Sequence, residues 1–168
     1  MNITIIGTGY VGLVTGVCLS NVSNKVICLD VDSDKINLLN QGISPIYEPG
    51  LDIKLKKGLS TKNLKFTSDS EDAIKSSEVI FIAVGTPSLD NGETDLSYVK
   101  SVAKSISKNI DSNKIIVTKS TVPVGTTYLI KKIIDDYLKK NNLEFQIDFI
   151  SNPEFLKEGK AIKDFESP

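Results

Sequence analysis

Three glycines near the N-terminus, Gly7, Gly9 and Gly12, have the spacing of a turn that binds a pyrophosphate. They follow a short apolar segment, residues 3–6, and open a segment whose apolar residues have helical spacing. In such a turn the first glycine lets the chain leave a strand tightly, the second lets the backbone approach phosphates, and the third lets a helix pack closely on the strands. The unpaired N–H groups and the dipole of that helix favour an anion at its first turn. The spacing therefore predicts a phosphate-binding turn.

An acidic residue, Asp30, ends the next apolar segment, residues 25–29. It lies close to the expected separation of about 20 residues, where a carboxylate can accept hydrogen bonds from the ribose of an adenosine. A carboxylate there would repel a 2′-phosphate, which favours NAD over NADP, and Lys35 would soften that repulsion. A glycine-rich turn of any α/β protein is the alternative interpretation. The flanking strands, the helix and Asp30 together favour a dinucleotide site.

The composition limits the chemistry that this chain can perform. All twenty basic residues among the 168 are lysine, the sequence contains no histidine, and the net charge is −1. With no imidazole and no guanidinium group, acid–base work falls to carboxylates, lysines, hydroxyls or water. No basic field is present to bind nucleic acid or an anionic membrane surface. The length and the apolar fraction of 40% fit one globular domain.

The cysteines and the N-terminal segment carry no signature of secretion. Cys18 falls on the core side of the first expected helix and Cys28 inside the second strand, so we expect both to be buried structural thiols. The N-terminal segment lacks a basic start and is broken by three glycines, which favours a strand, turn and helix over a signal peptide. No segment has the length of a membrane span. We therefore expect a cytoplasmic protein.

Short apolar segments alternate with helical patterns along the chain. This alternation predicts one α/β domain over residues 1–168, a doubly wound parallel sheet of the Rossmann type. One of the expected helices begins near Leu51 and ends at Gly58. The expected strands cover residues 3–6, 25–29, 64–67, 79–84, 115–118 and 147–150.

Ligands of such a sheet bind beyond the carboxyl ends of its strands. Five turns follow strands that are far apart in the sequence, and we expect these turns to meet at that edge. They are residues 7–12, Asp30, and residues 85–87, 120–121 and 152–154. The sequence thus predicts one site assembled from five turns.

Five motifs occur in order along nearly the whole chain. They are Gly7-Thr8-Gly9-Tyr10-Val11-Gly12-Leu13-Val14-Thr15-Gly16-Val17-Cys18-Leu19, Tyr47-Glu48-Pro49-Gly50-Leu51, Val84-Gly85-Thr86-Pro87, Lys119-Ser120-Thr121-Val122-Pro123-Val124-Gly125-Thr126 and Ser151-Asn152-Pro153-Glu154-Phe155-Leu156-Lys157-Glu158-Gly159. In these motifs the chain resembles the N-terminal, NAD-binding half of the UDP-glucose 6-dehydrogenases, within the UDP-glucose/GDP-mannose dehydrogenase family. The ordered set is far more specific than the glycine turn alone.

The resemblance implies an NAD-dependent, four-electron oxidation of UDP-glucose to UDP-glucuronate. Carbon 6 passes from alcohol to aldehyde to acid with two NAD molecules, through a thiohemiacetal and a thioester on a cysteine. In the family that cysteine lies in a later substrate-binding domain, beyond a central helix that carries most of the homodimer contacts. We therefore expect a truncated chain that binds NAD but does not oxidise UDP-glucose alone, and a homodimer at full length.

The resemblance also assigns roles to single residues. The pyrophosphate turn matches Gly7, Gly9, Tyr10, Val11 and Gly12, and the adenosine-ribose contacts match Asp30 and Lys35. Thr86 and Thr121 match cofactor contacts near the nicotinamide, and Glu158 is expected to reach cofactor or substrate. A segment that touches the nucleotide sugar matches Glu154, Phe155, Leu156, Lys157 and Glu158. Glu154 is the expected general base for the hydrolytic water, with Thr121 orienting that water. No metal site is expected.

Each assignment has a plainer alternative. Thr121 would suit a helix cap, Thr86 a turn, and Glu154 with Glu158 one solvated face of a helix, while Lys35 would be an ordinary surface lysine. Two other functions also stay open. One is a sister enzyme that acts on GDP-mannose or a UDP-N-acetylhexosamine, and the other is a non-catalytic, NAD-binding regulatory module.

Overall fold

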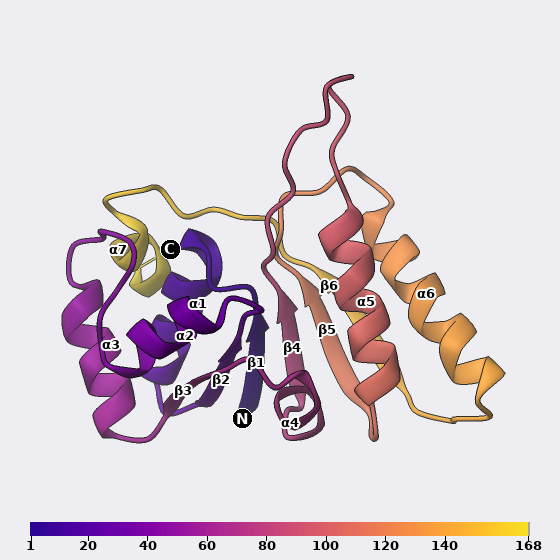
Figure 1. Cartoon of the computed structure of the whole chain (residues 1–168), viewed down its shortest axis with the longest axis horizontal. Coiled ribbons are helices and arrows are strands. Elements are labelled where there is room, and N and C mark those ends of the chain that lie inside the picture. The colour runs from indigo at the N-terminus through magenta and orange to yellow at the C-terminus, as the bar shows by residue number, and fades with distance from the viewer. Residues whose placement is uncertain (168) are drawn as a thin grey trace.

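A computed structural model describes residues 1–167, within which the chain forms six strands and seven helices (Figure 1). The strands are β1 (Asn2–Ile6), β2 (Lys25–Leu29), β3 (Leu64–Thr67), β4 (Val79–Ile82), β5 (Lys114–Thr118) and β6 (Ile147–Ser151). The helices are α1 (Tyr10–Ser20), α2 (Ser33–Asn40), α3 (Leu51–Ser60), α4 (Ser70–Lys75), α5 (Ser97–Asn109), α6 (Thr126–Lys140) and α7 (Ala161–Glu166).

All strands join one parallel sheet in the order β3-β2-β1-β4-β5-β6. The expected doubly wound parallel sheet is therefore confirmed. The chain works outward from β1 to β3 on one side and from β4 to β6 on the other, so its direction of progress reverses between β1 and β4. A crevice for a ligand forms at such a reversal, beyond the carboxyl ends of the strands.

Different helices cover the two faces of the sheet (Figure 1). Helices α1, α2, α3 and α7 pack on one face, and α4, α5 and α6 pack on the other. Strand β1 contributes to both clusters, because Ile3 and Ile5 belong to the first and Ile6 to the second. Burial on both faces explains why three of the five residues of β1 are isoleucine and why Thr4 between them is buried as well. None of the helices in the described part of the chain is long and apolar enough to cross a bilayer.

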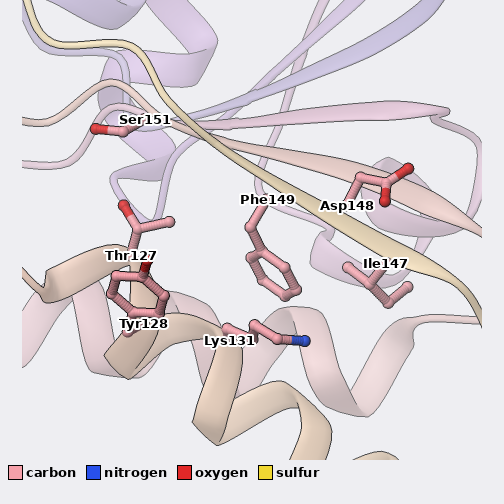
Figure 2. A pocket seen from close by; sticks show the side chains of 7 residues that line it. All are labelled: Thr127, Tyr128, Lys131, Ile147, Asp148, Phe149 and Ser151. Atoms are coloured by element: carbon pink, nitrogen blue, oxygen red, sulfur yellow. The ribbon is translucent and has the colours of Figure 1, made fainter.

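Strand β6 forms one edge of the sheet and is only partly buried. A hollow lies between this strand and α6, and Figure 2 shows the side chains around it. The ammonium group of Lys131 lies 5.2 Å from the centre of the Phe149 ring there. The lining residues are Thr127, Tyr128, Lys131, Ile147, Asp148, Phe149 and Ser151. None of the predicted site residues is among them.

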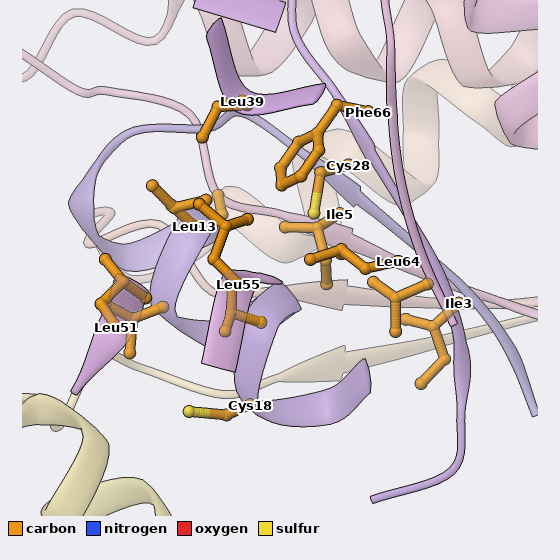
Figure 3. Packing of buried hydrophobic residues seen from close by; sticks show 14 of the residues in the cluster. Ile3, Ile5, Leu13, Cys18, Cys28, Leu39, Leu51, Leu55, Leu64 and Phe66 are labelled. Atoms are coloured by element: carbon orange, nitrogen blue, oxygen red, sulfur yellow. The ribbon is translucent and has the colours of Figure 1, made fainter. Parts of the chain in front are cut away.

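Both cysteines lie in the cluster beneath α1 (Figure 3). Cys18 is 3% exposed and Cys28 is fully buried, so the prediction of buried thiols is confirmed. Burial raises the pKa of the Cys18 thiol to about 12, with a smaller contribution from the charge of Glu166. Burial also raises the pKa of the Cys28 thiol. Neither cysteine can supply a thiolate near neutral pH.

The predicted end of α3 at Gly58 is wrong, because the helix continues to Ser60. Gly58 is a buried helical residue, and a Cβ there would lie 2.7 Å from Ser20 Oγ and 3.0 Å from Leu64 Cβ. The glycine therefore serves the close packing of α3 on α1 and β3 rather than the end of a helix.

The predicted strand over residues 79–84 is two residues too long, because β4 ends at Ile82. Ala83 and Val84 are apolar like the strand, but they line the crevice beyond it. Ser120 Oγ donates a hydrogen bond to Val84 O at 2.8 Å, which holds this turn against the one after β5.

A substitution at Gly16 tests the contact between α1 and β2. A Cβ on Gly16 would overlap the Cys28 sulfur, so we expect Gly16→Ala to destabilise the fold by about 1–3 kcal/mol despite the better helix propensity of Ala. The measurement is urea denaturation of the single variants and of Gly16→Ala with Cys28→Ala. The double variant should recover part of the loss, with a coupling of about 1 kcal/mol. Additive losses would show that the two sites do not clash.

Candidate functional site

The glycine turn occupies the gap between β1 and β4. Gly7 has a φ of +102°, and a Cβ on it would lie 2.5 Å from Ala83 O. A Cβ on Gly12 would overlap the carbonyl oxygen of Gly7. Gly9, the N-cap of α1, has no atom within 4 Å of the place a Cβ would take. Gly7 and Gly12 thus allow the backbone of the turn to pack closely on its neighbours. Gly9 leaves an open space beside the first N–H groups of α1, a cradle in which a phosphate fits.

Three turns line a pocket at this point, as the sequence predicts. It is formed by residues after β1, after β4 and after β5, namely Gly9, Tyr10, Val11, Ala83, Val84, Gly85, Thr86, Lys119, Ser120 and Thr121. Thr86 Oγ1 donates a hydrogen bond to Thr121 O at 2.8 Å and so ties two of the turns together. Thr121 does not cap a helix, because the N-cap of α6 is Gly125.

Asp30 joins the end of β2 to the glycine turn. Its Oδ2 accepts hydrogen bonds from the Thr8 backbone N–H at 2.8 Å and the Thr8 hydroxyl at 2.6 Å. Lys35 Nζ lies 3.3 Å from the same oxygen, and the Asp32 N–H donates to Oδ1 at 3.1 Å. Partial burial works to raise the pKa of Asp30, but the Thr8, Asp32 and Lys35 contacts outweigh it and the pKa lies below its usual value. Asp30 is therefore an ionised acceptor beside the turn, and Thr8 is a contact that sequence reasoning missed.

Lys119 is a buried lysine in the wall of the pocket, and its side chain is 1% exposed. Its ammonium group lies 3.6 Å from Glu154 Oε2, 3.5 Å from Asn152 Oδ1 and 4.4 Å from the centre of the Phe155 ring. Burial lowers the pKa of Lys119, and the charge of Glu154 offsets only part of that change. The contact between Lys119 and Glu154 brings the turn after β6 to the same edge of the sheet as the four other predicted turns.

Residues 152–160, which we call the crossing segment, run from β6 over the carboxyl edge of the sheet to α7 (Figure 1). Glu154 and Glu158 do not share a helical face, because these residues are not helical. Glu154 Oε1 accepts hydrogen bonds from the N–H groups of Phe155 at 2.8 Å and Leu156 at 2.7 Å. Within the described residues, Glu154 Oε2 is buried and accepts no hydrogen bond.

The far end of the crossing segment is attached to α1 through Glu48. This carboxylate is 4% exposed and accepts hydrogen bonds from the Tyr10 hydroxyl and from the N–H groups of Gly159 and Ala161. Sequence reasoning places Glu48 in a motif but gives it no role. Tyr10 is the first residue of α1, so its hydrogen bond to Glu48 links the predicted cofactor turn to the predicted substrate segment.

The strand order, the glycine turn and the acid after β2 define a dinucleotide-binding domain. Known families narrow this class. The chain belongs to the UDP-glucose/GDP-mannose dehydrogenase family, whose NAD-binding domain matches residues 1–168. The cofactor of this domain is therefore NAD, and the open cradle at Gly9 and the acceptor at Asp30 both fit that cofactor.

Individual relatives share this domain. UDP-glucose 6-dehydrogenase TuaD of Bacillus subtilis is 49% identical over 162 residues, which are 96% of this chain and 34% of that protein. A ternary complex of GDP-mannose dehydrogenase from Pseudomonas aeruginosa has a TM-score of 0.93 at 41% identity, covering 100% of this chain and 39% of its own. A UDP-glucose dehydrogenase from Pyrobaculum islandicum has a TM-score of 0.93 at 36% identity, covering 99% and 39%. The chain thus spans little more than a third of each relative.

A pair of variants separates the two tasks open to Asp30. We expect Asp30→Ala to weaken NAD binding by about 1–3 kcal/mol, because a charged acceptor for the ribose is lost. Thr8→Val is the matched control, since it removes the hydroxyl contact to Asp30 and keeps the carboxylate. Calorimetry on both variants should show the larger loss for Asp30→Ala. Equal losses would mean that Asp30 only holds the turn.

Proposed function

We propose that this chain is the NAD-binding half of a UDP-glucose 6-dehydrogenase, which oxidises carbon 6 of UDP-glucose to the acid with two NAD molecules. The family membership and the identity of 49% with TuaD over 96% of the chain support this proposal. The observation that carries it is the contact of Glu154, from the crossing segment, with Lys119 in the wall of the cofactor pocket. An acid–base group from the predicted substrate segment therefore lies beside the cofactor site.

The residues of the pocket divide the work of holding NAD. Bound NAD accepts the hydride of each oxidation. We assign the pyrophosphate to the cradle at Gly9, the adenosine ribose to Asp30, and the nicotinamide end to Thr86 and Thr121. The assignments of Thr86 and Thr121 agree with the hydrogen bond between Thr86 Oγ1 and Thr121 O, which holds both residues at the pocket.

Glu154 is the proposed general base for hydrolysis of the thioester. Its Oε1 is engaged by two backbone N–H groups, whereas in the described part of the chain Oε2 accepts no hydrogen bond and has only the Lys119 ammonium group 3.6 Å away, so Oε2 is the atom that can accept a proton. We assign to Oε2 the proton of the attacking water, with Thr121 orienting that water. Because Cys18 and Cys28 are buried, the thiolate that forms the thioester is proposed to lie in the longer protein, outside this chain.

A sister activity is the second candidate. The solved GDP-mannose dehydrogenase has the same TM-score, 0.93, as the solved UDP-glucose dehydrogenase and a higher identity, 41% against 36%. The fold of this domain therefore does not distinguish the two sugars. UDP-glucose is preferred because the identity with TuaD is higher still, at 49%.

Turnover by the full-length protein tests the choice between the two candidates. We expect NADH to form with UDP-glucose at two equivalents per sugar, and we expect GDP-mannose and UDP-N-acetylmannosamine to react far more slowly. The measurement is absorbance of NADH with each sugar at equal concentration. A preference for GDP-mannose would establish the sister activity, and binding of NAD with no turnover of any sugar would favour a regulatory module.

The role of Glu154 predicts a particular kinetic defect. In the full-length Glu154→Gln variant, we expect a burst of about two NADH per active site, followed by steady-state turnover lowered by about 10²-fold or more, because the general base acts after both oxidations. Stopped-flow absorbance measures both phases. Glu144→Gln, which changes an exposed carboxylate on the loop before β6, is the control and should behave like the wild type. Loss of the burst itself would place Glu154 in the oxidation instead.

A further inference from the structure

We propose that Glu48 is a positioning residue that fastens the crossing segment to the cofactor turn and thereby sets where Glu154 and Glu158 lie. The proposal rests on the proposed function in giving those two glutamates a place in the site. Its structural part, the attachment itself, is independent of that function.

Glu48 lies at the point where three parts of the chain meet. Its Oε2 accepts hydrogen bonds from the Tyr10 hydroxyl, at the start of α1, and from the Gly159 N–H at 2.7 Å. Its Oε1 accepts a hydrogen bond from the Ala161 N–H, at the start of α7, at 2.9 Å. One side chain from the loop before α3 thus holds both the glycine turn and the crossing segment.

The attachment needs a charged, buried acceptor. Glu48 is 4% exposed, and a carboxylate so deep is strongly unfavourable unless donors surround it. Burial works to raise the pKa of Glu48, but the hydrogen bonds from Tyr10 and from the N–H groups of Gly159, Ile162 and Ala161 outweigh it, so the pKa lies below its usual value. Burial and the Glu48 contact raise the pKa of the Tyr10 hydroxyl, which stays a donor. Glu48 is ionised at neutral pH and accepts from all of these groups.

The route of the crossing segment shows why an anchor is needed. The segment leaves β6 at one edge of the sheet and ends at α7, which packs on α1 beyond the first half of the sheet (Figure 1). Between these ends it is held by the contact of Lys119 with Glu154, by the stacking of Phe155 on Phe165 and by the packing of Leu156 against the first hydrophobic cluster. Without Glu48, the end of the crossing segment that carries Glu158 and Gly159 would lose hydrogen bonds that fix its position relative to the crevice.

The α7 end has a second, exposed attachment that does not replace Glu48. Lys54 on α3 forms an ion pair with Glu166 on α7, and Phe155 stacks on Phe165 with ring centres 6.4 Å apart. Both contacts hold the later part of α7 rather than its first turn. Exposed ion pairs are weak. Glu48 therefore supplies two of the hydrogen bonds that hold residues 159–161, from the N–H groups of Gly159 and Ala161, beside the packing of Ala161 in the hydrophobic cluster.

Glu48→Gln in the full-length protein tests the proposal. The amide keeps the size of the side chain but presents an N–H₂ group to donors, so we expect faster hydrogen–deuterium exchange in residues 155–162 and unchanged exchange in β1. Binding of NAD should stay within about threefold, while kcat with the accepted sugar should fall by about ten- to a hundredfold, because a shift of about 1 Å in a reacting group is enough for such a loss. Glu48→Asp keeps the charge and should retain more activity than Glu48→Gln.

Glu78→Gln is the matched control. Glu78 also accepts a backbone hydrogen bond, from Asn2 N–H at 2.9 Å, but at the amino end of β1. The Glu78→Gln variant should leave hydrogen–deuterium exchange in residues 155–162 and kcat unchanged. Unchanged protection of residues 155–162 in Glu48→Gln, or a uniform loss of protection that includes β1, would overturn the proposal, and so would a variant that does not fold. The exchange and NAD measurements need no sugar, so they test Glu48 even if UDP-glucose proves not to be the substrate.

The pH dependence of stability gives a second test, of the charge on Glu48. The ionisable groups near Glu48 are Tyr10 and Cys18 on α1, Glu158 on the crossing segment, and the Lys54–Glu166 pair. A carboxyl whose pKa is lowered by folding stabilises the fold fully above its unfolded pKa of about 4.3 and loses that contribution as the pH falls through its folded pKa. The melting temperature of Glu48→Gln should therefore lie below the wild type at pH near 7, with a gap that narrows below pH of about 4. A gap that does not depend on pH would contradict an ionised anchor.

Discussion

The site depends on the close approach of backbone to backbone at the glycine turn. A Cβ on Gly7 would lie 2.5 Å from Ala83 O, and a Cβ on Gly12 would overlap the oxygen of Gly7. With hydrogens in both places, α1 begins directly at the end of β1, in the gap that the strand order opens between β1 and β4. The first N–H groups of α1 then face the pocket that the turns after β4 and β5 also line. A larger residue at either position would move the helix and, with it, every contact that Tyr10 makes.

Much of the fold could be predicted because its information is local. Apolar segments, turns and helical spacing place the strands and predict a doubly wound parallel sheet, since strands that alternate with helices have few other arrangements. They do not give the order of the strands in that sheet. The errors have a common cause. A glycine that ends a helix and one that lets two elements touch look alike in a sequence, so the sequence alone places Gly58 wrongly at the end of α3. Ala83 and Val84 are apolar because they line the crevice, and apolarity alone does not distinguish that from membership of β4.

The site was predicted as a set of turns but not as a set of contacts. Parallel strands present their carboxyl ends at one edge, which is enough to bring five turns together. The partners of a buried charge are decided by residues far away in sequence, as with Glu48 and Gly159, 111 positions apart. Lys119 directly follows β5 and could have been noticed for that reason. In a chain whose basic residues are all lysine, however, a single lysine gives no signal of burial.

The two residues that flank Gly9 tie the turn to other parts of the protein. Thr8 donates its N–H and its hydroxyl to Asp30 at the end of β2, and Tyr10 donates its hydroxyl to Glu48 beneath the crossing segment. Each side chain is thus committed to a carboxylate of the protein, on opposite sides of the turn. Gly9 has no side chain and no neighbour within 4 Å of its Cβ position, so its backbone is open to the pyrophosphate that we propose for this place. Contacts within the protein that hold such a turn lower the ordering cost that binding of the proposed ligand has to overcome.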